Sequence, residues 1–185
     1  MKVSLEVSKQ KSAHASLRPD FISTSVADVD FKYLKSIGIT ACFIDLDGTV
    51  VSRGTFEVDQ KIQDVLKNSG LAIHIATNRP KSRSLKSLKE QLHATSVIHP
   101  KGVYGKPTKK YYLAALKELG LKKSEVVMIG DRFIQDIYGA NRAGIYSLAV
   151  FKLGAHKGRV DKTISGAERR LTDKLFASYN DSSVK

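Results

Sequence analysis

Short apolar runs alternate along this chain with longer segments whose apolar residues recur at helical spacing. Five of the runs suit buried strands, at residues 39–44, 71–76, 96–98, 125–129 and 145–151. Helices are expected at residues 26–37, 58–68, 81–92, 107–119 and 133–143. Strands that alternate with helices through short links form parallel sheets with helices on both faces. The sequence therefore predicts an α/β fold built on a five-stranded parallel sheet.

The length of 185 residues suits a single domain with one core. We expect a polar N-terminal arm at residues 1–19, the domain at residues 20–155, and a basic amphipathic helix and tail at residues 156–185. That helix could cap the core or lie on a membrane surface.

Composition bears on compartment and on partners. No apolar run approaches the roughly 20 residues that span a bilayer, and the polar N-terminus lacks the apolar centre of a signal peptide. A single cysteine, Cys42, fits a reducing compartment, so we expect a cytoplasmic protein. The net charge of +13, from 31 basic and 18 acidic residues, favours anionic partners: phosphate-bearing substrates, nucleic acid or anionic membrane.

Two aspartates, Asp45 and Asp47, stand two residues apart where the first predicted strand ends, before a Gly-Thr turn. Because residues i and i+2 of a strand point to the same side, the two carboxylates are expected to converge. Clustered carboxylates repel each other unless a proton or a cation lies between them, and Mg2+ takes oxygen ligands. The pair indicates a nucleophile or metal ligand beside an acid/base group. The alternative is an ordinary turn, in which Asp and Gly are favoured.

Three further groups of polar residues follow the later strands. Thr77 and Asn78 offer a hydroxyl and backbone N–H groups just before a helix, a place that suits phosphoryl oxygens. Lys106 is a cation at a helix start, and Asp131 and Asp136 follow the fourth strand. In parallel sheets of this kind, ligands bind beyond the carboxyl ends of the strands. We therefore expect these residues at one site. The alternatives are ordinary turn residues at Thr77 and Asn78, a solvent-exposed lysine at position 106 and helix capping by Asp131.

In this combination the chain resembles the haloacid dehalogenase-like superfamily. The matching motifs are Asp45-Leu46-Asp47-Gly48-Thr49, Thr77-Asn78, Lys106-Pro107, and Gly130-Asp131 with Asp136. More closely, the chain is similar to subfamily IIIA and its YqeG-like branch of phosphatidylglycerophosphate phosphatases, through Leu17-Arg18-Pro19-Asp20 and the run from Gly130 to Gly144. The resemblance implies a three-layer α/β/α, Rossmann-like core and phosphatase activity.

The resemblance also implies roles in catalysis. Asp45 would attack the phosphoryl group to form an aspartyl-phosphate, and Asp47 would protonate the leaving oxygen and then activate water. Thr77, the Asn78 backbone and Lys106 would neutralise charge on the phosphoryl oxygens. An acid/base group at position 47 suits hydrolysis of phosphate monoesters.

Mg2+ is the cofactor that the resemblance implies. Its ligands would be the carboxylate of Asp45, the backbone carbonyl of Asp47, and Asp131. Asp136 would hold either a water on the metal or Lys106.

Spacing between the motifs bears on the kind of substrate. Relatives that act on small metabolites usually carry a cap domain, inserted after the first motif or between the second and third. The intervals from Asp47 to Thr77 and from Thr77 to Lys106 have no room for a domain of typical size. The site is therefore expected to be capless and open, which suits a lipid, a protein or a nucleic-acid end.

These expectations lead to three hypotheses. The first is a Mg2+-dependent phosphatidylglycerophosphate phosphatase of phospholipid biosynthesis, acting at the inner membrane face. The second keeps the chemistry but takes a nucleotide, a nucleic-acid end or a phosphoprotein as substrate. The third is a nucleic-acid-binding protein on an inactive phosphatase scaffold, which the full set of catalytic residue types disfavours.

Overall fold

The computed structural model describes residues 16–52, 54–100, 102, 104–151, 153 and 170. The arm predicted at residues 1–19 lies outside the described residues except for its last four. The predicted C-terminal helix and tail lie outside them except for position 170.

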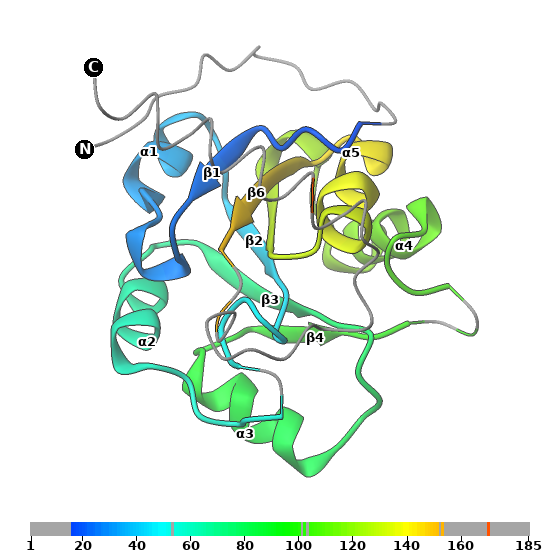
Figure 1. The fold of residues 1–185 in the computed structure, drawn as a ribbon. Coiled ribbons are helices and arrows are strands. Elements are labelled where there is room, and N and C mark those ends of the chain that lie inside the picture. Colours follow the sequence, from blue (N-terminus) through cyan, green and yellow to red (C-terminus); the bar gives the residue numbers. More distant parts are fainter. Residues whose placement is uncertain are drawn as a thin grey trace. The chain divides into compact units, whose positions relative to one another are not determined.

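A parallel sheet organises the described chain (Figure 1). Its strands are β1 (Phe21–Ser23), β2 (Ala41–Ile44), β3 (Ala72–Ala76), β4 (Ser96–Ile98), β5 (Val126–Gly130) and β6 (Tyr146–Val150). They lie in the order β1-β6-β5-β2-β3-β4, and every neighbouring pair is parallel. The central strand β2 is therefore flanked by β5 and β3, whose Met128 and His74 are level with Phe43. The predicted α/β class with a parallel sheet is confirmed.

The predicted number of five strands was wrong, because the sheet has a sixth strand, β1. This strand has three residues, too few for apolar alternation to be visible in the sequence. It pairs with β6 at the edge of the sheet, where Phe21 is level with Leu148. The carboxylate of Asp20 anchors the pairing by accepting hydrogen bonds from the Ser147 backbone N–H (2.8 Å) and hydroxyl (3.0 Å).

Helices connect the strands close to where the sequence predicts them. The α-helices are α1 (Phe31–Ser36), α2 (Gln60–Lys67), α3 (Arg83–Gln91), α4 (Lys109–Leu119) and α5 (Gly139–Ala143). Short 3-10 turns form η1 (Val26–Asp28) and η2 (Lys123–Glu125), and a π-helical segment forms η3 (Phe133–Tyr138). The helix predicted at residues 26–37 is divided, because Asp30 caps α1 by accepting a hydrogen bond from the Tyr33 backbone N–H.

The two faces of the sheet carry separate apolar clusters in the described chain. Cys42 and Ile44 of β2 pack in the cluster that includes side chains of α1, α2 and α3. Ala41 and Phe43, which alternate with them, pack in the cluster that includes side chains of α4 and α5. Helices therefore cover both faces, which confirms the three-layer α/β/α architecture (Figure 1).

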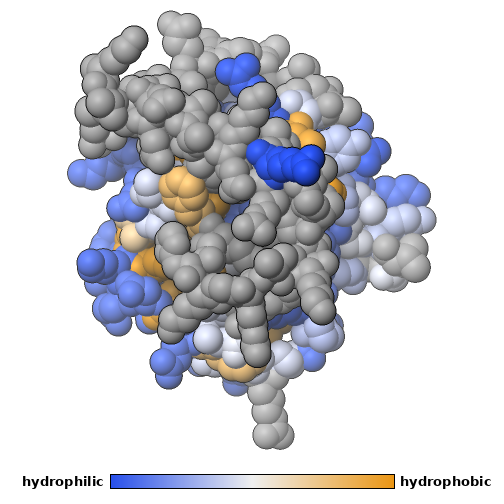
Figure 2. Space-filling model, viewed as in Figure 1, coloured by the Kyte–Doolittle hydropathy of each residue, from blue (hydrophilic) through white to orange (hydrophobic). Residues whose placement is uncertain are grey.

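The links between the motifs contain no inserted domain in the described residues. Only one helix, α2, lies between β2 and β3, and only α3 lies between β3 and β4. The fold is therefore capless. On the face drawn in Figure 2, hydrophilic residues cover much of the described surface, with smaller hydrophobic areas among them. None of the described helices has the length and apolar character needed to cross a membrane.

Candidate active site

The predicted site residues follow the carboxyl ends of three neighbouring strands. Asp45 comes directly after β2, Thr77 after β3 and Asp131 after β5. Lys106 reaches the same edge from the link between β4 and α4, and Asp136 from η3. The structure thus brings residues separated by up to 91 positions to one edge of the sheet, as the rule for parallel sheets leads one to expect.

Lys106 lies buried between two carboxylates. Its Nζ is 2.6 Å from Asp45 Oδ1 and 2.7 Å from Asp136 Oδ1. The side chains of Lys106, Asp45 and Asp136 are 1%, 9% and 0% exposed. The second oxygen of Asp136 accepts a hydrogen bond from the Arg132 backbone N–H at 3.2 Å. One ammonium group therefore pairs with two carboxylates, which leaves an excess of negative charge in the site.

Electrostatics keep Lys106 and Asp136 charged at neutral pH. Burial alone would lower the pKa of Lys106, but the carboxylates of Asp136 and Asp45 outweigh it and raise that pKa above its ordinary value. Burial raises the pKa of Asp136 to about 6, against the opposing effect of Lys106. Because the pKa of the ammonium is far above that of the carboxyl, the proton stays on Lys106.

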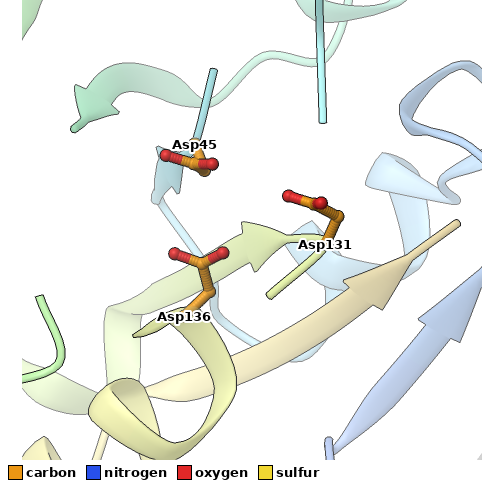
Figure 3. Close-up of side chains that lie close together, drawn as sticks. All are labelled: Asp45, Asp131 and Asp136. Carbon is orange, nitrogen blue, oxygen red and sulfur yellow. The ribbon is translucent and has the colours of Figure 1, made fainter. Parts of the chain in front are cut away.

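Asp131 is held in place by the turn that follows Asp47. The Thr49 hydroxyl donates to Asp131 Oδ1, and the Asp131 backbone N–H donates to the Thr49 hydroxyl, both at 3.1 Å. Figure 3 shows the carboxylates of Asp45, Asp131 and Asp136 directed toward a common space. One oxygen from each lies within 4.8 Å of the others. Buried carboxylate oxygens at this separation fit a hard divalent cation such as Mg2+.

The carboxylate of Asp47 has a different partner. Arg79 binds it through both oxygens, Nε donating to Oδ2 at 2.7 Å and Nη2 donating to Oδ1. The expectation that Asp45 and Asp47 converge relied on strand alternation, but β2 ends at Ile44. Beyond it the backbone turns, with the Gly48 N–H donating to the Val51 carbonyl at 2.8 Å. Asp47 is consequently about one-third exposed at the mouth of the site.

Arg79 and Phe56 are neighbours of the site that sequence reasoning missed. The Arg79 guanidinium lies 5.6 Å from the centroid of the Phe56 ring, and its backbone N–H donates to the Thr77 hydroxyl at 3.0 Å. Arg79 could have been found in the sequence as a cation that directly follows Thr77-Asn78. The loop that carries Phe56 has no comparable signal.

Asn78 braces the loop that carries Lys106. Its side-chain amide donates to the Lys106 carbonyl (3.0 Å) and accepts from the Lys106 backbone N–H (2.9 Å). Gly105 allows this approach, since a Cβ at that position would meet Asn78 Oδ1 at 2.6 Å. The sequence predicted a phosphate-binding backbone at Asn78; the structure adds a side chain that links the two loops.

Gly130 should tolerate no side chain, because a Cβ there would collide with the carboxylate of Asp136. We expect Gly130→Ala to displace Asp136 from Lys106 and to lower the free energy of unfolding by about 1–3 kcal/mol. Thermal unfolding of the wild type and the variant measures this. In an Asp136→Gly background, which removes the side-chain atoms that the new Cβ would meet, Gly130→Ala should lower the free energy of unfolding by less. An equal loss in both backgrounds would contradict the proposed collision.

Comparisons with known proteins agree with the fold and with a phosphatase. A family model described as HAD-hydrolase-like matches residues 103–175, which include Lys106, Asp131 and Asp136. The chain is 24% identical over 160 residues to the probable phosphatase YqeG of Bacillus subtilis, covering 85% of this chain and 90% of that protein.

Two further similarities are shorter or structural. A segment of 48 residues is 44% identical to the phospholysine phosphohistidine inorganic pyrophosphate phosphatase of Xenopus laevis, covering 26% of this chain and 18% of that protein. The crystal structure of an uncharacterized protein from Listeria monocytogenes serotype 4b superposes with a TM-score of 0.51 at 18% identity, covering 75% of this chain and 98% of that one. This last likeness concerns the fold alone.

Proposed function

We propose that this haloacid dehalogenase-like phosphatase is a Mg2+-dependent phosphate monoesterase that uses Asp45 as nucleophile, with phosphatidylglycerophosphate as its substrate. The observation that carries the chemistry is the buried Lys106, bound to Asp45 and Asp136 beside the Asp131 carboxylate. Burying such a group of charges lowers stability, and buried groups with strongly shifted pKa values cluster at functional sites.

Each proposed role follows from a position in the site. Lys106 orients the Asp45 carboxylate, whose other oxygen attacks phosphorus, and its charge offsets the phosphoryl oxygens. The P–O bond to the leaving group breaks, and Asp47, protonated after it separates from Arg79, donates its proton to that oxygen. Asp47 then takes a proton from the water that hydrolyses the aspartyl-phosphate. Thr77 and the Asn78 backbone would bind phosphoryl oxygens.

The metal would be held by Asp45, Asp131 and the backbone carbonyl of Asp47. Both oxygens of Asp136 already accept hydrogen bonds, from Lys106 and from the Arg132 backbone, so Asp136 is better placed to fix Lys106 than to bind the ion directly. When bound, Mg2+ would supply positive charge for the transferring phosphoryl group.

The choice of a lipid as the substrate is supported by other observations than the chemistry is. The capless fold leaves the site open to a leaving group that is anchored elsewhere. The net charge of +13 favours an anionic surface such as the inner membrane face. A relative that covers 85% of this chain is named a probable phosphatase, which supports the phosphatase chemistry and leaves the substrate open.

A phosphate-release assay tests this proposal. Phosphatidylglycerophosphate in mixed micelles, an aryl phosphate and a nucleoside monophosphate are offered with Mg2+ and with EDTA. We expect turnover that EDTA abolishes, with a kcat/KM for the lipid at least about tenfold above the others, a difference of about 1.4 kcal/mol. Preference for the nucleotide would overturn the lipid assignment, and turnover that survives EDTA would overturn the role of the metal.

A further inference from the structure

The large apolar side chains that remain exposed in the described chain lie in segments that follow the carboxyl ends of strands, on the side of the sheet where the candidate site lies. They are Phe56, Tyr104 and Ile134, which are 49%, 43% and 40% exposed. Tyr104 lies two residues before Lys106, and Ile134 lies three residues after Asp131. Phe56 contacts Arg79, the partner of Asp47. The segments after β2, β4 and β5 thus each carry one exposed apolar side chain, and each of these segments also carries or contacts a candidate site residue.

Cations accompany the two exposed aromatic rings. Arg79 lies over Phe56, while Lys110 Nζ is 4.4 Å from the centroid of the Tyr104 ring and donates to the Tyr104 hydroxyl at 3.3 Å. Lys81 and Lys110 line, together with Tyr104, a groove beside β4. The segments 77–82 and 99–105 contain no acidic residue. Glu57 is the acidic neighbour of Phe56 in the sequence, and Glu118 lines the groove together with the two lysines.

We propose that the site mouth docks on an anionic lipid bilayer through a rim formed by Phe56, Tyr104 and Ile134 with Lys81 and Lys110. Aromatic rings settle at the boundary between headgroups and acyl chains, and lysine and arginine bind anionic headgroups. Ile134 favours a bilayer over nucleic acid, because an aliphatic side chain offers no ring on which a base could stack.

This inference rests on the proposed lipid substrate and adds how the site would lie relative to the bilayer. An open site whose edge lies against the headgroups can receive a phosphate monoester without removing the lipid from the bilayer. The buried carboxylates of Asp45 and Asp131 then face the membrane rather than the cytoplasm.

Tryptophan fluorescence tests the docking, since the chain contains no tryptophan. Phe56→Trp places one reporter on the rim. Lys123→Trp, in η2 at the amino end of β5, places a matched reporter at the opposite edge of the sheet. We expect the emission of the rim reporter to shift to the blue with vesicles of phosphatidylglycerol and phosphatidylcholine, and not with phosphatidylcholine alone. The control reporter should not respond.

Vesicle co-sedimentation supplies the second readout. The Phe56→Ser/Tyr104→Ser variant should bind the anionic vesicles at least about tenfold more weakly than the wild type, and Lys123→Ser should bind like the wild type. Unchanged vesicle affinity in the double variant, or a silent rim reporter, would overturn the proposal. A rim reporter that responds to an oligonucleotide but not to vesicles would overturn it in favour of nucleic acid.

The two proposals can fail separately. Vesicle binding is measured without substrate, whereas the proposed function is tested by phosphate release from micelles. Turnover of the lipid without a rim response would contradict the docking alone.

Discussion

Replacing Asp45 with asparagine should abolish phosphate release, lowering kcat by at least about 10⁴-fold. The amide has nearly the same shape as the carboxylate, but its oxygen is a poor nucleophile. It can still accept the hydrogen bond from Lys106 Nζ that Asp45 Oδ1 accepts at 2.6 Å. The loss should therefore reflect chemistry rather than folding. Phosphate release under saturating substrate measures it, and circular dichroism reports on the fold.

A matched control is available on the surface of α2. Asp64 is exposed and accepts a hydrogen bond from the Gln60 side chain within the same helix. Asp64→Asn should leave kcat unchanged. Residual activity of Asp45→Asn near the wild-type level would exclude Asp45 as the nucleophile.

Replacing Lys106 with methionine should lower the free energy of unfolding by about 3–5 kcal/mol, because it leaves the buried carboxylates of Asp45 and Asp136 without their cation. Such a loss corresponds to a fall in the melting temperature of roughly 6–20 °C for a chain of this size. Phosphate release should fall as well, since the same ammonium orients the nucleophile. Thermal unfolding in the absence of divalent metal measures the stability.

Two further variants separate the buried charge from general effects of losing a lysine. Lys109 is exposed at the start of α4, and Lys109→Met should change the melting temperature little. Lys106→Met should lower the free energy of unfolding by less in an Asp136→Asn background, because only one of the two carboxylates that lose their cation is then charged. An equal loss of unfolding free energy in both backgrounds would show that the Lys106–Asp136 ion pair contributes nothing to stability.

Much of the fold and of the clustering of polar residues could be predicted from the sequence. Apolar runs mark the strands β2 to β6, and a parallel sheet must bring their carboxyl ends to one edge. That single rule places Asp45, Asp131 and Lys106 together although they are distant in the chain. No property of the individual residues was needed, only the order of strands and helices.

Other features depend on interactions that leave no periodic pattern. The direction of the Asp47 carboxylate is decided by the turn after Ile44 and by Arg79, whereas the prediction assumed that the strand continued. Strand β1 is held by its pairing with β6 and by Asp20, which bonds to Ser147. Each of these features requires knowledge of a contact partner, and the sequence alone does not reveal it.

The pairing of β1 with β6 has a consequence for how the protein forms during synthesis. Phe21 leaves the ribosome before its neighbour in the sheet, Leu148, which is translated 127 residues later. At about 5–20 residues per second this delay amounts to roughly 6–25 s, far longer than a helix needs to form. The edge of β6 that receives β1 is therefore completed by a strand that is translated before all the other strands of the sheet and must wait for them to emerge.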